Sequence, residues 1–185
     1  MRLQRAAMEL FAERGYAEVT IAEIADRAGL TKRSFFNHFA DKREVLFAGA
    51  QDFEDSAVQH LAEADDDLGP TDVAVLALTR AGLELAAYAE YAQARYELIA
   101  SAAELRERDL IKMASLATAI AEALSRRGVL PRTATLTAQA AITVFIAAYA
   151  DWITGGETAD LEGLMQQSLA DLRRAVGQAE TLHPD

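Results

Sequence analysis

The sequence predicts an all-α protein, and three observations support that prediction. Apolar residues recur at spacings of three and four along most of the chain, which is the period of a helix with one buried face. Alanine, the strongest helix former, is abundant, whereas proline occurs only three times. The hydrophobic fraction of 51% is high enough for a chain of 185 residues to bury a core.

The first two helices are delimited by capping signals. A helix is expected over 2–14, with Gly15 as its C-terminal stop. The next helix begins after Thr20, because Thr20 and Glu23 have the spacing of a capping box, and it ends at Gly29.

Two further helices are expected in the first third of the chain. A short helix over 32–38 has Thr31 as its cap. A second capping-box pair, Asp41 and Glu44, is expected to open a long helix that continues unbroken to about residue 63.

The clearest break in the chain is the acidic turn over 65–70, which contains three aspartates, a glycine and a proline. Five helical stretches follow it, over 72–88, 91–102, 104–127, 133–154 and 159–177. We expect a first helical domain over 1–47 and a second helical domain over 48–185.

The charge is unevenly distributed along the chain. The net charge is -11, but residues 1–50 hold eight Lys and Arg against seven Asp and Glu, whereas the remainder holds ten against twenty-two. A DNA-binding protein needs positive charge where it meets phosphate rather than in total. The stretch 31–43 has four cations against one aspartate and is the place to expect that contact.

Several classes of protein and site are disfavoured. The chain has no cysteine, which excludes disulfides and thiolate metal sites and suits the cytoplasm. No run of about 18 apolar residues indicates a membrane span, and the N-terminus lacks the apolar run of a signal peptide. We find no nucleophile–base motif, glycine-rich phosphate loop or metal-ligand spacing, so we expect no enzyme, cofactor or metal site.

The segment 20–39 has the pattern of a helix-turn-helix. Gly29 suits the tight turn, and Ile24, Leu30 and Phe35 are expected to form the core between the two helices. The short second helix then carries Lys and Arg side chains that reach guanine or phosphate, and Asn, which reaches adenine. The alternative is a small packing module whose cations are merely solvated.

Here the sequence resembles the TetR family of one-component transcriptional regulators. The matching runs are 10–16 (LFAERGY), 20–25 (TIAEIA), 29–31 (GLT), 35–39 (FFNHF) and the pair 41–42 (DK). The resemblance implies about nine helices, of which the first three bind operator DNA and the fourth links them to a ligand-binding body. It also implies a homodimer through the helices near 133–154 and 159–177.

Carried over by position, the resemblance implies eight DNA contacts: Thr20, Thr31, Lys32, Arg33, Ser34, Asn37, His38 and Lys42. For His38 two interpretations remain open, a contact to phosphate or packing between two helices. The family usually has Tyr where this chain has Phe36, so a phenolic contact to phosphate is lost, and Phe36 is then interpreted as a core residue.

The second domain is expected to hold a pocket for a small, mostly apolar effector. The candidate lining residues are Tyr88, Tyr91, Arg95, Ile99, Met113, Leu116, Phe145, Tyr149 and Trp152. Arg95 would anchor an anionic group of the ligand. The alternative is that these aromatic residues are ordinary core and that Arg95 pairs with a nearby carboxylate.

Two apolar stripes suggest the dimer interface. The helix over 159–177 carries apolar residues at coiled-coil spacing, and the helix over 133–154 has a wide apolar face opposite a side of small residues. Intramolecular core packing is the alternative for both stripes.

These features predict a ligand-responsive regulator, most commonly a repressor in this family, that binds a palindromic operator as a dimer. An effector would release it by swinging the continuous helix over 41–63. The competing interpretations are a DNA-binding protein without a ligand and, least favoured, an enzyme.

Overall fold

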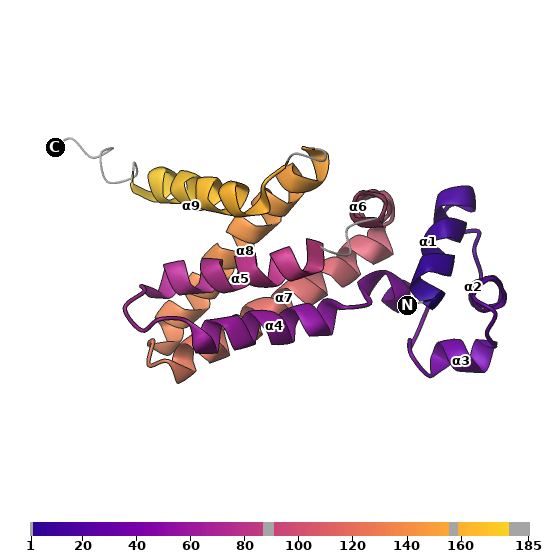
Figure 1. Ribbon diagram of the computed structural model, residues 1–185, viewed down its shortest axis with the longest axis horizontal. Helices are drawn as coiled ribbons and strands as arrows, with labels where there is room; N and C mark the ends of the chain where they lie inside the picture. Colours follow the sequence, from indigo (N-terminus) through magenta and orange to yellow (C-terminus); the bar gives the residue numbers. More distant parts are fainter. Residues whose placement is uncertain (1, 87–90, 156–158, 178–185) are drawn as a thin grey trace. The chain divides into compact units, whose positions relative to one another are not determined.

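The computed structural model describes residues 2–86, 91–155 and 159–177. Within these residues the chain is all-α, as predicted, with nine α-helices and one 3-10 helix, η1 (Figure 1). The elements are α1 (Arg2–Arg14), α2 (Ile21–Arg27), α3 (Lys32–Phe36), η1 (Arg43–Phe47), α4 (Ala50–Glu63), α5 (Pro70–Ala86), α6 (Ala92–Ser101), α7 (Ala103–Arg126), α8 (Pro131–Thr154) and α9 (Leu161–Gly177).

The chain folds into two compact units. Of the described residues, the first unit takes 2–51 together with 91–112, and the second takes 52–86 together with 113–177. The first unit is therefore built from two separate segments, because α6 and the start of α7 belong to it alongside α1, α2 and α3.

The first unit has its own hydrophobic core. Phe11 of α1, Ile24 of α2 and Phe35 of α3 are at most 2% exposed, and all three belong to one cluster. The apolar side chains Ile99 of α6 and Leu105 of α7 complete the same cluster. Burial of such residues from five helices fixes how α2 and α3 are held.

The second unit is a bundle of α4, α5, most of α7, α8 and α9, in which α8 packs against both α5 and α9. By length and composition alone α8 is apolar enough to cross a membrane, and 44% of its most apolar stretch is buried inside the protein. Arg127 closes the turn between α4 and α5 by donating to the carbonyls of Leu61, Ala64 and Asp65.

The expectation of an unbroken helix from residue 41 to about residue 63 is wrong. Ala48 is extended and Gly49 has a φ of +87°, which ends η1 and starts α4 as a new helix. Just before η1, the Asp41 carboxylate accepts from the backbone N–H groups of Arg43 at 2.8 Å and Glu44 at 3.3 Å. Glu44 does not complete the capping box, because its carboxylate pairs with Arg108 at 2.5 Å and Lys112 at 3.5 Å.

Candidate nucleic-acid interface

The start of α2 is held by a complete capping box. The Thr20 hydroxyl accepts from the Glu23 backbone N–H at 3.3 Å, and the Glu23 carboxylate accepts from the Thr20 backbone N–H at 2.8 Å. The Thr20 hydroxyl also donates to that carboxylate at 2.7 Å. These hydrogen bonds, with Arg14 beside them, lower the pKa of Glu23 to about 2.

The turn between α2 and α3 is a Schellman motif. Gly29 has a φ of +66°, Leu30 N–H donates to the Ala25 carbonyl at 2.8 Å, and Gly29 N–H donates to the Asp26 carbonyl at 3.0 Å. A positive φ at this position turns the chain sharply without a side-chain clash. The motif therefore sets the direction in which α3 leaves α2.

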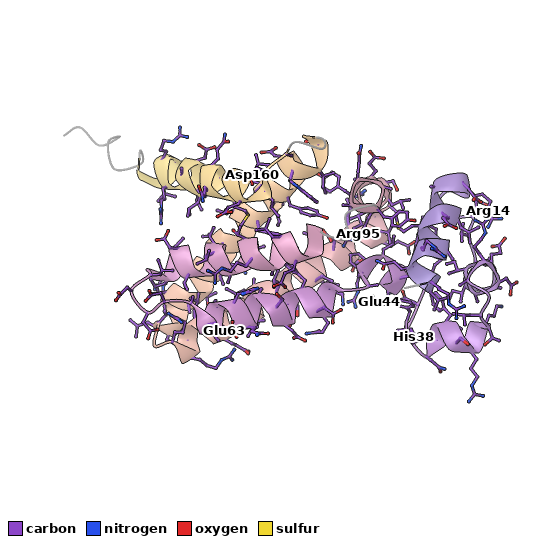
Figure 2. The ribbon with its side chains drawn as sticks, in the orientation of Figure 1. Arg14, His38, Glu44, Glu63, Arg95 and Asp160 are labelled. Carbon is purple, nitrogen blue, oxygen red and sulfur yellow. The ribbon has the colours of Figure 1, made fainter. Side chains whose placement is uncertain are left out.

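One side of α3 is anchored in the core, and the other side faces solvent. Phe35 is fully buried and packs against Phe39, with ring centres 5.4 Å apart. Of the eight predicted DNA contacts, six are exposed: Thr20, Thr31, Lys32, Arg33, Asn37 and His38. Figure 2 labels His38 just after the end of α3.

Lys32 and Arg33 differ from most of the other cations of the first unit. Within the described residues neither side chain has an ion pair or a hydrogen bond. Among the other Lys and Arg side chains described in the first unit, Arg2 alone also lacks one. Two neighbouring cations on an exposed helix are therefore available to an external anion.

The neighbouring arginines are already neutralised. Arg14 pairs with Glu23 at 2.9 Å and Arg27 pairs with Glu13 at 2.9 Å; Figure 2 labels Arg14 at the end of α1. Arg43 pairs with Asp41 at 2.7 Å, which lowers the pKa of that carboxyl group. These pairs leave the positive charge of this segment concentrated on α3.

Three predicted contacts are engaged in capping. The Thr20 hydroxyl belongs to the α2 box, and the Thr31 hydroxyl accepts from the Ser34 backbone N–H at 3.1 Å as the α3 cap. The Ser34 and Thr31 hydroxyls lie 3.0 Å apart. These side chains orient α3 and have less freedom to turn toward another molecule.

The ammonium group of Lys42 already has partners within the protein. Its Nζ donates to the carbonyls of Tyr16 at 2.7 Å and Val19 at 2.9 Å, and it is half-buried. Desolvation lowers the pKa of Lys42. Its ammonium group is therefore occupied within the protein, where it holds the connection between α1 and α2, and is not turned to solvent.

The interpretation of Phe36 as a core residue is wrong. Its side chain is 54% exposed, and its ring stands edge-on against Phe35 with centres 5.8 Å apart. One signal was present in the sequence: Phe36 follows Lys32 by four residues and Arg33 by three, which places it on their side of the helix.

The predicted ligand-binding residues are divided between the two units. Tyr88 lies outside the described residues, and Tyr91 and Ile99 pack with the core of the first unit. Arg95 donates to the Leu46 carbonyl at 2.6 Å and lies 3.8 Å from an Asp109 carboxylate oxygen. Arg95 thus pairs within the protein, and Figure 2 labels it on α6.

The remaining candidates, Met113, Leu116, Phe145, Tyr149 and Trp152, belong to or pack against the core of the second unit. Phe53, Phe145, Tyr149 and Trp152 form an aromatic row with successive ring centres 5.1, 5.6 and 5.7 Å apart. Two open grooves in the described part of this unit, along α7 and α8 and beside the start of α9, are lined by other residues.

Comparison with known proteins identifies both parts of the chain. Residues 3–48 match the model for the N-terminal domain of bacterial regulatory proteins of the TetR family. Residues 69–177 match the model described as the MftR C-terminal domain, which is one of the TetR C-terminal models.

Individual relatives agree with these family models. The transcriptional activator FasR of Mycolicibacterium smegmatis is 41% identical over 59 residues, which are 32% of this chain and 27% of that protein. The uncharacterised regulator YerO of Bacillus subtilis is 30% identical over 67 residues, which are 36% and 23% of the two chains. The chain thus matches about a quarter of the length of these curated relatives.

A solved structure is similar along nearly the whole chain. The transcriptional repressor FadR of Thermus thermophilus, in complex with lauroyl-CoA, is 26% identical and has a TM-score of 0.55. The similarity covers 91% of this chain and 90% of that protein.

Proposed function

Because the chain belongs to the TetR family of bacterial regulatory proteins, we propose that it is a ligand-responsive transcriptional repressor. It binds a palindromic operator as a homodimer, with α3 in the major groove, and a small, mostly apolar effector releases it. It acts in the cytoplasm.

The observation that carries this proposal is the exposed, unpaired pair Lys32 and Arg33 on α3. A cation that gains a phosphate releases condensed counterions, which supplies affinity, whereas a cation that meets guanine supplies specificity. Asn37 and His38 lie beside this pair and are exposed as well. The buried Phe35 fixes the helix, so these side chains are presented without reordering the backbone.

The dimer is supported by an uncharged face on α8. Leu136 is 64% exposed and Ile146 is 48% exposed, and Thr143 and Ala147 lie on the same side at helical spacing. On α9, by contrast, Leu161, Met165 and Leu169 are already buried in the core of their own unit. We therefore assign most of the contact between subunits to α8, with α9 at its border.

The effector is supported by the aromatic row in the second unit and by the relative that binds lauroyl-CoA. A row of rings offers a large apolar surface to a ligand that separates them. The effector can shift DNA affinity only by its differential affinity for the two states of the dimer.

One observation favours a second candidate function, a DNA-binding regulator without an effector. Leu116 is 2% exposed and Phe145 is 6% exposed, and neither lines the two grooves found in the described part of the second unit. A ligand that reaches Phe145 must therefore displace packed core, which costs free energy that the binding has to offset.

The test of DNA binding is fluorescence anisotropy on DNA selected from a random library, over a salt titration. The Lys32→Ala/Arg33→Ala variant should bind weakly, with a log–log salt slope shallower by about one to two per half-site. The matched control is Arg80→Ala/Arg126→Ala, which removes the same charge from exposed positions of α5 and α7 and should bind as the wild type does.

Selected palindromes, with a loss confined to the α3 variant, support the proposal. Equal binding by both variants, or no enriched site, contradicts it.

Thermal-shift screening with lauroyl-CoA and medium-chain apolar acids, followed by anisotropy at saturation, then separates the two candidate functions. A compound that binds and lowers DNA affinity supports the effector, whereas failure of every such binder to change affinity favours the second candidate.

A further inference from the structure

Phe36 is the one large apolar side chain between residues 2 and 51 that is prominently exposed. Its 54% exposure places most of an aromatic ring in solvent on a helix whose other outward residues are polar. A single exposed apolar side chain is common on protein surfaces, so the exposure of Phe36 gains meaning only from its place beside the two unpaired cations of α3.

The ring is oriented as well as exposed. It follows Arg33 by three positions and Lys32 by four, so it lies on the side of α3 that carries the two unpaired cations. Its edge-on contact with the fully buried Phe35, at 83° between the ring planes, limits the directions it can take. A held ring loses little side-chain entropy when it binds.

The chemistry of the DNA surface decides what such a ring contacts. A phenylalanine has no donor for a phosphate oxygen. Among base edges in the major groove, the apolar group is the C5-methyl of thymine, and Phe is one of the side chains that contact it. Lys32 and Arg33 bring this side of α3 toward the phosphates and bases.

We propose that Phe36 contacts the C5-methyl group of one thymine in each operator half-site and thereby makes that thymine a requirement of the sequence. This inference rests on the proposed DNA-binding function and adds a specificity-determining residue to it. In this inference one base of each half-site is recognised by the apolar ring of Phe36, on the same side of α3 as Lys32 and Arg33.

The test replaces each thymine of the selected operator in turn by deoxyuridine, which removes only the methyl group. For the wild type, affinity should fall about fourfold at one symmetry-related position, the value of one buried methyl-sized group. Phe36→Ala should bind the thymine operator more weakly and show no further loss with uracil at that position. This non-additivity is the signature of a direct contact.

Lys32→Ala is the matched control, because it weakens binding from the same helix but should keep the fourfold uracil effect. If Phe36→Ala keeps that effect, or if no uracil substitution weakens the wild type, the inference is overturned. Loss of affinity in Lys32→Ala shows in the same experiment that the proposed function still stands. If the wild type binds no selected DNA, both the proposed DNA-binding function and the inference about Phe36 are wrong. Melting curves establish that Phe36→Ala is folded.

Discussion

Lys42 contacts Tyr16 twice: its Nζ donates to the Tyr16 carbonyl at 2.7 Å and lies 4.1 Å from the centre of the Tyr16 ring. The same nitrogen donates to the Val19 carbonyl at 2.9 Å. One ammonium group therefore satisfies two backbone carbonyls in the loop that leads from α1 to α2. This relationship separates Lys42, which is held within the protein, from Lys32 and Arg33 of the same unit, which are exposed.

Replacing Lys42 by Met should destabilise the protein by about 1–3 kcal/mol, because two carbonyls lose a charged donor. Lys32→Met, from an exposed position without a partner among the described residues, should leave the free energy of unfolding nearly unchanged and weaken DNA binding instead. Denaturant titration with anisotropy measures both quantities. The reverse pattern would mean that Lys42 acts chiefly on DNA.

Glu23 gives the protein a pH dependence in acid. Its pKa is lowered to about 2, first by the Thr20 hydroxyl, so its carboxylate stabilises the fold above the unfolded value near 4.5. That stability is lost as the pH falls from about 4.5 toward 2. In Glu23→Gln the free energy of unfolding should therefore change less over this window, as measured by denaturant titration at several pH values. An unchanged profile would contradict this role.

Gly29 should resist substitution because of its backbone, not because of crowding. A Cβ there would meet nothing within 4 Å, yet the φ of +66° disfavours L-residues. Gly29→Ala should cost about 1–2 kcal/mol of stability, and Gly29→Asn should cost less, since Asn tolerates this conformation. Equal losses in thermal unfolding of the two variants would indicate a steric cause.

The proposed dimer predicts a charge-sensitive face on α8. Leu136→Lys combined with Ile146→Lys should raise the dimer dissociation constant about tenfold or more in sedimentation equilibrium, because a charge would be buried without a partner. Leu68→Lys, at a residue that is 39% exposed in the turn before α5, is the control and should not change assembly. A dimer that persists unchanged would move the interface off α8.

Much of the fold was predictable because capping signals are local. The sequence places the ends of α1 and α2 correctly, since Gly15 and Gly29 have positive φ and Thr20 caps as expected. The break at Gly49 was missed, because the apolar stripe continues through it and one glycine inside a helical pattern is often tolerated. Its conformation depends on packing that periodicity does not show.

The site was predictable only in its exposed part. Residue type and helix position sufficed to predict that Lys32 and Arg33 lie exposed on α3, since exposure needs no partner. The hydrogen-bond partners of Lys42 and Arg95 could not be predicted, because they are backbone carbonyls 23 and 49 residues away in the sequence. The exposure of Phe36 depended on Phe35 filling the core position beside it, a choice that two adjacent phenylalanines leave open in the sequence.

The two-segment composition of the first unit has a consequence for synthesis on the ribosome. Leu105 is fully buried and Ile99 is 8% exposed in the core around Phe11 and Phe35. Translation proceeds from the N-terminus, so α1 to α3 emerge long before the residues that complete their core. The nascent helix-turn-helix must therefore remain with part of its apolar surface uncovered until α6 and the start of α7 have left the exit tunnel.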